Sequence, residues 1–262
     1  MATVHALTLY PIKGCAGVVV ERAEVTATGL AHDRLFAPVK PNGDVIWQGE
    51  APMLATIRCR VLHDGAKLEL SAPGAGELVL DVAVDGKTHP AGVERWPGSG
   101  IDQGDEVAEW LTGVLGRPAR LVREPAWSSR GRDEVDPNAL LVLSLSTLDG
   151  LNARIAERGA DPVPMDRFRP NIVVDGWPEP HTEDRVRRMA VGGAEVGFGE
   201  LAIRCAVTLV DQSAGVRVGP EPLRTLADYR REPDGVSFGL KAAVLSPGHI
   251  AVGDGVTVTE WR

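Results

Sequence analysis

The feature that most constrains this chain is a series of short apolar segments, rich in β-branched residues and separated by glycine-containing turns. Regular spacing of this kind predicts strands joined by tight turns, the pattern of a β-barrel or sandwich. Asn42-Gly43 is typical of such turns, because this dipeptide tolerates the positive φ of a hairpin. The segments expected to form strands are 4–10, 18–26, 35–39, 55–62, 67–70, 77–84, 119–122, 140–143, 172–174, 201–210 and 256–260.

A smaller part of the chain has the 3.6-residue apolar repeat of a helix. Gly116 can end the first of these segments, and Ser146 with Asp149 has the spacing of a capping box at the start of the second. The expected helices cover Asp105–Leu115, Thr147–Arg158 and Pro222–Arg231. The predicted fold class is therefore mainly β with a few helices (α+β).

Charge and cysteine content exclude several classes of protein. The net charge of -8 argues against broad nucleic-acid binding, although a local basic pocket is still compatible with it. The three cysteines form no CxxC motif and leave one unpaired, which argues against a disulfide or zinc scaffold and for a reducing cytoplasm. No signal peptide is expected, and no apolar run approaches the roughly 18 residues of a membrane span.

Two polar segments each leave two interpretations open. The segment 124–138 is rich in charge and proline, and it is either a mobile lid or a solvated connection. Arg167-Phe168-Arg169-Pro170-Asn171 carries two arginines, which either clamp a phosphate or cover apolar groups at the surface.

Cys205 lies in the middle of the segment 201–210, where alternate apolar residues predict a strand. A cysteine in this position is often a small buried hydrophobic residue. Alternatively, Arg204 and nearby backbone amides stabilise a thiolate that binds a soft metal. On the strand alone, the buried hydrophobic residue is the favoured reading.

Several ordered blocks together resemble the MOSC family, named after the C-terminal domain of molybdenum cofactor sulfurase, with its N-terminal β-barrel domain in front. The resemblance covers nearly the whole chain and points to the mitochondrial amidoxime reducing components and their bacterial counterparts. The blocks are Leu9-Tyr10-Pro11-Ile12-Lys13, Asp33-Arg34-Leu35, Arg167 to Val174, Arg204-Cys205, Val210-Asp211, Glu221-Pro222-Leu223, Phe238-Gly239 and Pro247-Gly248. The domain division implied is 1–120 for the MOSC N-terminal β-barrel domain and 121–262 for the MOSC β-barrel domain.

The resemblance implies a molybdenum cofactor, that is, molybdenum bound by molybdopterin. It makes Cys205 the catalytic residue and the protein ligand of the metal. Lys13 and Arg34 match residues that hold the phosphate and the pterin. Arg169 and Asn171 match contacts in the family's arginine-proline-asparagine motif, and Arg204 precedes the metal ligand. At the level of the family only, the resemblance also implies pyridoxal phosphate binding.

Some expected cofactor contacts differ from the family pattern. Gly14 stands where many relatives have serine, so its contribution is limited to the backbone amide. Asn138 stands where serine or threonine is common and can still donate or accept a hydrogen bond. Lys241 follows Phe238-Gly239 at a position that is often polar, and it either reaches a phosphate or points to solvent.

The resemblance therefore implies an oxidoreductase that reduces N-hydroxylated compounds such as amidoximes, hydroxylamines and N-hydroxylated base analogues. The chain ends without the iron-sulfur module of some relatives, so a separate ferredoxin- or flavoprotein-type electron donor is expected. No nucleic-acid or membrane partner is expected. The alternative is a binding module that carries the cofactor or transfers sulfur through a Cys205 persulfide.

Overall fold

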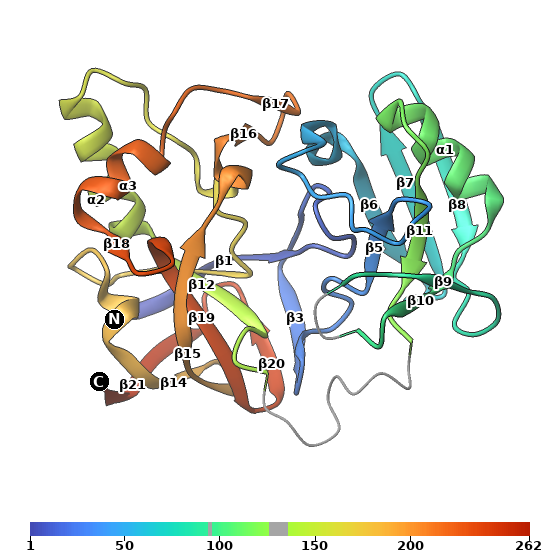
Figure 1. Ribbon diagram of the computed structural model, residues 1–262. Coiled ribbons are helices and arrows are strands. Elements are labelled where there is room, and N and C mark those ends of the chain that lie inside the picture. The colour runs from blue at the N-terminus through green and yellow to red at the C-terminus, as the bar shows by residue number, and fades with distance from the viewer. Residues whose placement is uncertain (94–95, 126–135) are drawn as a thin grey trace.

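The computed structural model describes residues 1–93, 96–125 and 136–262. The chain folds into two strand-rich halves that lie side by side, and both termini lie in the half drawn on the left of Figure 1. The segment 124–138, expected to be either a lid or a solvated connection, falls largely outside the described residues. Within the described ranges, no helix combines the length and apolar character needed to cross a bilayer.

The left half is a closed barrel of seven strands, because β19 returns to pair with β12. Its strands follow the order β12, β13, β1, β21, β14, β15 and β19, and all neighbours are antiparallel except β12 and β13. Their bounds are β1 Ala2–Leu9, β12 Leu140–Ser144, β13 Ile172–Asp175, β14 Val186–Val191, β15 Ala194–Arg204, β19 Gly235–Ser246 and β21 Gly255–Trp261. Buried aliphatic side chains from these strands form the core of the barrel. The mainly β fold is thus confirmed.

The first strand of the chain belongs to this barrel, since Leu7 of β1 pairs with Ile172 of β13. The next strands stay with it: β2 pairs with β1, and β3 pairs with β4 and β20. Their bounds are β2 Val18–Val20, β3 Arg22–Thr26, β4 Gly29–Leu30 and β20 Gly248–Ala251. The predicted domain division at residue 120 stays a prediction; in space, strands β1 to β4 lie with the barrel, while Ile12 and Cys15 between them pack into the core of the other half.

The right half contains two small sheets, a short 3-10 helix and one α-helix around a second apolar core. One sheet has the order β5, β11, β10, β9 and the other the order β6, β7, β8. The bounds are β5 Phe36–Val39, η1 Pro52–Thr56, β6 Arg58–Leu62, β7 Lys67–Ala72, β8 Gly76–Asp81, β9 Thr88–Pro90, β10 Ser99–Asp102, α1 Asp105–Leu115 and β11 Arg120–Arg123. The helix has the predicted bounds, and Gly116 ends it at a φ of 63°.

The remaining helices pack on the barrel around a third apolar cluster. They are α2 Leu145–Glu157, α3 Leu223–Tyr229 and the 3-10 turns η2 Met165–Arg167, η3 Thr182–Arg185 and η4 Ala206–Leu209. Three two-residue strands complete the fold: β16 Val210–Asp211, β17 Val216–Arg217 and β18 Arg231–Glu232. The predicted capping box at Ser146 is wrong, because the Oγ of Ser144 accepts the hydrogen bond from the Thr147 amide at 3.2 Å.

Three predicted strands need correction. The strand expected over 201–210 ends at Arg204, because the amide of Thr208 folds back to the carbonyl of Cys205 and begins a 3-10 turn. The strand expected over 18–26 is two strands that pair with different partners. The segment 55–62 starts within the 3-10 helix η1 and becomes a strand from Arg58 onwards.

Candidate functional site

Tyr10 directly follows β1 and lies at the centre of the candidate site. Its ring is buried, its hydroxyl donates to the carbonyl of Pro170 at 3.2 Å, and its amide donates to Asp33 Oδ1 at 2.7 Å. Burial raises the pKa of Tyr10 to about 12 against the opposing effect of Arg169 and Arg34. The phenol of Tyr10 is therefore neutral near pH 7, and the hydrogen bonds of the Tyr10 hydroxyl and amide hold the ring in place.

Two arginines from distant segments lie over this ring. The guanidinium carbon of Arg169 is 4.2 Å from the ring centroid, and that of Arg34 is 5.0 Å from it. Arg34 also donates to Asp33 and, at 3.1 Å, to the side-chain oxygen of Asn171. Both arginines have positive φ, 58° and 52°, a backbone conformation that a long side chain adopts only where the surrounding structure enforces it.

Arg204, the last residue of β15, brings a third guanidinium into the same cluster. It donates to the carbonyl of Phe168 at 2.6 Å, and its Nε is buried without a hydrogen-bond partner among the described residues. Burial lowers its pKa to about 10, the charge of Cys205 opposes this shift, and Arg34 and Arg169 add to it. Arg204 therefore stays charged at neutral pH. Three close cations with a spare donor favour an anionic ligand.

Cys205 follows Arg204 and is exposed, unlike Cys15 and Cys59, which lie in the core of the other half. Its carbonyl accepts from both the amide and the hydroxyl of Thr208, at 3.1 and 3.0 Å. This turn ends the strand and leaves the thiol accessible. The interpretation of Cys205 as a buried core residue is therefore wrong, and a soft sulfur ligand is available beside the arginines.

The two asparagines predicted to contact the cofactor differ in how many hydrogen bonds their side chains already make. Asn171 is fully buried, accepts from Arg34 and from the amide of Leu141, and donates to the carbonyl of Thr8 at 3.2 Å. It thus ties three strands of the barrel together and fixes Arg34. Asn138 instead has a buried Oδ1 without a hydrogen-bond partner among the described residues, which leaves an acceptor for a ligand.

The other predicted contacts lie at different places. Lys13 is exposed, and its backbone amide donates to the carbonyl of Phe36 at 2.8 Å. Gly14 has a φ of 83°, so glycine suits this turn next to Lys13. The ammonium of Lys241 pairs with Glu200 Oε1 at 2.7 Å on the neighbouring strand, so a carboxylate already engages this predicted phosphate contact.

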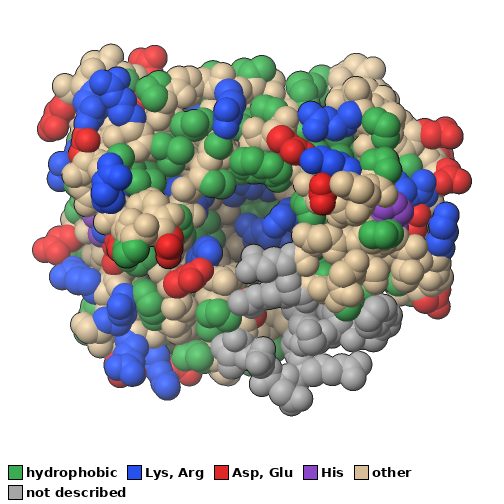
Figure 2. Space-filling view, viewed as in Figure 1, with side chains coloured by type: hydrophobic (Ala, Val, Ile, Leu, Met, Phe, Trp, Pro, Cys, Tyr) green, Lys and Arg blue, Asp and Glu red, His purple; other side chains and the backbone are tan. Residues whose placement is uncertain are grey.

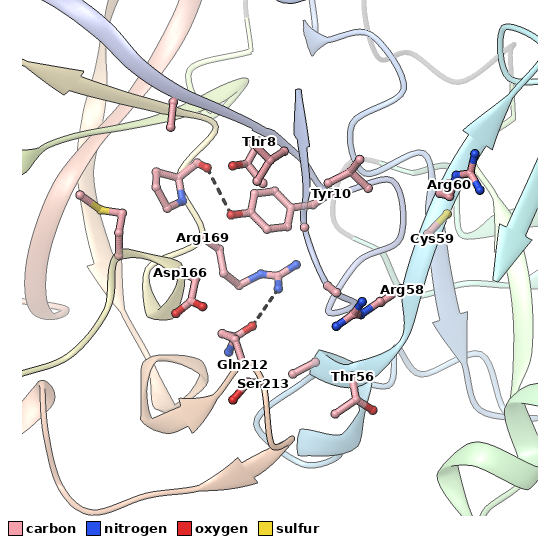
Figure 3. A pocket seen from close by; sticks show the side chains of 18 of the residues that line it. Thr8, Tyr10, Thr56, Arg58, Cys59, Arg60, Asp166, Arg169, Gln212 and Ser213 are labelled. Atoms are coloured by element: carbon pink, nitrogen blue, oxygen red, sulfur yellow. Dashed lines mark hydrogen bonds between the residues drawn. The ribbon is translucent and has the colours of Figure 1, made fainter. Parts of the chain in front are cut away.

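A cavity of about 760 Å³ lies between the two halves. Strand β6 and helix η1 line one side, and β1, the segment 165–170 and Gln212 line the other. Figure 3 shows Arg169 pointing into this space with its hydrogen bond to Gln212, and Figure 2 shows Lys and Arg side chains within the hollow of the molecule. Arg169 thus connects the arginine cluster with a space of the size of a small-molecule site.

Sequence reasoning missed three residues that build the site: Tyr10, Gln48 and Gln212. Tyr10 stood in a block that resembles the family, but no role was assigned to it. Gln212 lies in a turn-forming segment, and nothing in the sequence singles out Gln48. The signal is tertiary, because each of these side chains acts through partners far away in the chain.

Comparison with known proteins shows which domains and relatives the chain resembles. Residues 1–118 match the model of the MOSC N-terminal beta barrel domain, and residues 131–257 match that of the MOSC domain. Mitochondrial amidoxime reducing component 2 of Bos taurus is 33% identical over 98% of this chain and 83% of that protein. Mitochondrial amidoxime-reducing component 1 of Homo sapiens is also 33% identical, over 98% of this chain and 82% of that protein.

A molybdenum cofactor sulfurase of Oryza sativa subsp. japonica is 28% identical over 90% of this chain, and the match covers 32% of that longer protein. The N-terminal barrel domain thus precedes the MOSC domain, as predicted from the sequence, and the amidoxime reducing components match along nearly the whole chain. The chain belongs to the family of MOSC-domain proteins that includes the mitochondrial amidoxime reducing components.

Proposed function

We propose that this protein is a molybdenum-cofactor-dependent oxidoreductase that reduces N-hydroxylated compounds such as amidoximes, hydroxylamines and N-hydroxylated base analogues. The observation that carries the proposal is the convergence of Arg34, Arg169 and Arg204 around Tyr10, directly beside the exposed Cys205. The names of the relatives agree with it, because they describe proteins that reduce amidoximes or that act on the molybdenum cofactor.

The residues present fit an anionic pterin cofactor. Its phosphate needs convergent cations, and the three guanidiniums supply them without a full set of carboxylate partners. The buried Nε of Arg204 and Oδ1 of Asn138 lack partners, and a buried polar group of this kind is normally satisfied by something. A ligand with an acceptor at the arginine cluster would satisfy the Nε of Arg204.

When bound, the cofactor supplies the two-electron chemistry at molybdenum. The chain contributes the surroundings: Cys205 offers a thiolate to the metal, and Arg204, with its pKa of about 10, keeps a positive charge next to it. The Tyr10 ring holds two guanidiniums in place through cation–π contacts. Lys13 and Gly14 remain proposed contacts, whereas the pairing of Lys241 with Glu200 argues against the contact predicted for Lys241. The proposed substrate entry past residues 124–138 lies largely outside the described residues.

Electrons would come from a separate ferredoxin- or flavoprotein-type donor. The cytoplasmic location also stays a prediction, since the amidoxime reducing relatives are mitochondrial by name. A second candidate function is a carrier that delivers the cofactor or takes sulfane sulfur from a donor persulfide onto Cys205, which leaves the donor as a thiol. The exposed thiol and the similarity to a molybdenum cofactor sulfurase support this alternative.

The test is anaerobic reduction of benzamidoxime and of hydroxylaminopurine by protein purified from a cofactor-competent host, with a reduced viologen as electron donor. Molybdenum and pterin are quantified in the same preparation. Turnover with stoichiometric, non-exchanging molybdenum supports the reductase. Transfer of the cofactor to an apo-enzyme without any turnover of an N-hydroxylated compound would replace it with the carrier.

A further inference from the structure

Gln48 and Gln212 form a reciprocal amide pair that joins the two halves of the molecule. The Nε2 of Gln48 donates to Oε1 of Gln212 at 2.9 Å, and the Nε2 of Gln212 donates to Oε1 of Gln48 at 3.1 Å. Gln48 precedes η1 in the right half, and Gln212 follows β16 in the left half. Gln48 is 1% exposed, so its side of the pair is shielded from water, whereas Gln212 is half-buried and lines the cavity.

The pair also reaches three parts of the candidate site. The second amide hydrogen of Gln48 goes to the carbonyl of Gly14 at 3.0 Å, next to Lys13. That of Gln212 goes to the carbonyl of Val210 at 3.1 Å, beyond the turn that follows Cys205. The Oε1 of Gln212 additionally accepts from the guanidinium of Arg169 at 3.2 Å, the bond drawn in Figure 3.

The neutrality of Gln212 matters for Arg169. Arg34 and Arg204 lie near enough to Arg169 for their charges to act on one another, so repulsion opposes its position. A carboxylate at position 212 would hold Arg169 but cancel its charge. An amide oxygen holds the guanidinium and leaves the positive charge for a ligand. The Tyr10 ring, which also contacts Arg169, is neutral in the same way.

We propose that Gln48 and Gln212 are positioning residues: their amide pair sets the register of the two halves, and Gln212 thereby holds Arg169 charged and oriented toward an anionic ligand. The identity of that ligand as the pterin cofactor rests on the proposed function. The register of the two halves does not depend on the proposed function, and it can be measured in cofactor-free protein.

The first experiment measures hydrogen exchange in cofactor-free protein carrying Gln48→Met, Gln212→Met or both substitutions. Methionine fills a similar volume but cannot form the pair. We expect Gln48→Met to accelerate exchange of residues 206–216, in the other half, about tenfold, the effect of losing hydrogen bonds of ordinary strength. The double variant should resemble Gln212→Met, because that substitution already removes the pair together with the bonds to Val210 and Arg169.

Gln103→Met is the matched control. Gln103 is a buried glutamine of the right half whose amide bonds the backbone of Ala83 and Ile101, away from the interface. Its loss should lower the melting temperature without changing exchange of residues 206–216. Unchanged exchange there in Gln48→Met, or fully additive effects in the double variant, would overturn the register.

The second experiment uses Gln212→Glu, which can still accept from Arg169 but neutralises its charge. Because glutamate also loses the donor bonds to Gln48 and Val210, the comparison is with Gln212→Met, which loses the same bonds without adding a charge. We expect pterin content per folded protein to be at least tenfold lower in Gln212→Glu than in Gln212→Met, at an equal or higher melting temperature, a combination that a purely structural role would not produce. Full pterin retention in Gln212→Glu would overturn the role assigned to Gln212. Wild-type protein without any pterin would instead refute the proposed function, and the exchange experiment would still decide the register.

Discussion

The barrel contains two clusters of buried polar side chains that differ in how completely they are satisfied. In one, the carboxylate of Glu183 accepts from the amide and hydroxyl of Ser144 at 3.2 and 3.1 Å and from the hydroxyl of Thr147 at 2.8 Å. In the other, Arg34, Arg169 and Arg204 gather around Tyr10, and the Nε of Arg204 has no partner among the described residues.

The difference separates a structural cluster from a ligand site. The Glu183 cluster sits at the start of α2, where a negative charge is favourable and free amides need acceptors. Its groups satisfy one another, so nothing is left for a ligand. The arginine cluster concentrates charge of one sign and keeps a donor free, which costs stability unless something anionic binds there. Burial and polarity alone would not have distinguished them.

Among substitutions at the arginine cluster and the adjacent cysteine, Cys205→Ser should have the largest effect on activity. Serine is a poor ligand for a soft metal, so we expect loss of molybdenum and a fall in reductase rate of at least about a hundredfold. Because Cys205 is exposed, the melting temperature should change little. Metal analysis, rate assay and thermal unfolding check this.

The buried Cys59 provides the contrast. Burial raises the pKa of its thiol to about 12, so it stays protonated, and Cys59→Ser should cost about 1–3 kcal/mol of stability through burial of a hydroxyl. Molybdenum content per folded molecule should be unaffected. A Cys205→Ser variant with full activity would refute the assignment of Cys205 as metal ligand.

Glu183→Ala should have the largest effect on stability. It leaves the amide and hydroxyl of Ser144 and the hydroxyl of Thr147 without their acceptor, at a cost of about 3 kcal/mol or more in the free energy of unfolding. Urea denaturation measures this, and Glu183→Gln, which keeps an acceptor, should lose less. Pterin content per folded molecule should not change; a selective loss of pterin would make this cluster part of the site.

Arg204→Met should have the opposite effects from Glu183→Ala: little loss of stability and a large loss of pterin. Removing one of three like charges offsets the lost hydrogen bond to Phe168, so stability of the cofactor-free protein should change by less than about 1 kcal/mol. Pterin retention should fall about tenfold or more, because a charge-assisted contact is lost. Arg187→Met, which removes an exposed arginine paired with Glu260, is the control and should change neither quantity measurably.

The pH dependence of stability should come in part from His181, which lies next to the Glu183 cluster. Burial, with Arg230 and Arg154 nearby, lowers the pKa of His181 from 6.5 to about 4, and its amide donates to Thr147 beside Glu183. The unfolded chain thus binds a proton at a higher pH than the folded chain. His181 should therefore add no penalty above pH 6.5 and should destabilise the fold progressively between pH 6.5 and 4, whereas the pKa values of Glu183 and Asp184, which burial raises, act in the opposite direction.

His181→Asn tests this, since asparagine tolerates the positive φ of 62° at this position. Denaturation curves across this pH range should show a shallower loss of stability in the variant. An unchanged slope would exclude His181 as the group responsible.

Lys241→Met should have the smallest effect. The ammonium of Lys241 is one-third exposed and paired with Glu200, so its loss should cost at most about 1 kcal/mol. Pterin content should stay at the wild-type level. A fall in pterin content would instead support the cofactor contact that the family resemblance predicts.

Local patterns predicted the elements that depend on local interactions. Helix α1 has the expected bounds because its apolar stripe and the left-handed Gly116 lie within one segment. The strand predicted around Cys205 is too long, since alternating apolar residues continue to Leu209 while the strand ends at Arg204 and a 3-10 turn follows. That turn depends on hydrogen bonds to the Cys205 carbonyl, which compete with the strand pairing and are invisible in an alternation of apolar residues.

The sequence by itself determined the mainly β fold, the helix positions and, through ordered family blocks, the set of arginines and the cysteine expected at the site. Only the tertiary structure decided that Arg34 and Arg169 share the ring of Tyr10 with Arg204 nearby, that Asn171 is used within the barrel, and that Lys241 pairs with Glu200. The reason is physical. Strand and helix formation follow from periodicities within a segment, whereas the exposure, charge environment and hydrogen-bond partners of a side chain depend on segments brought together when the barrel closes.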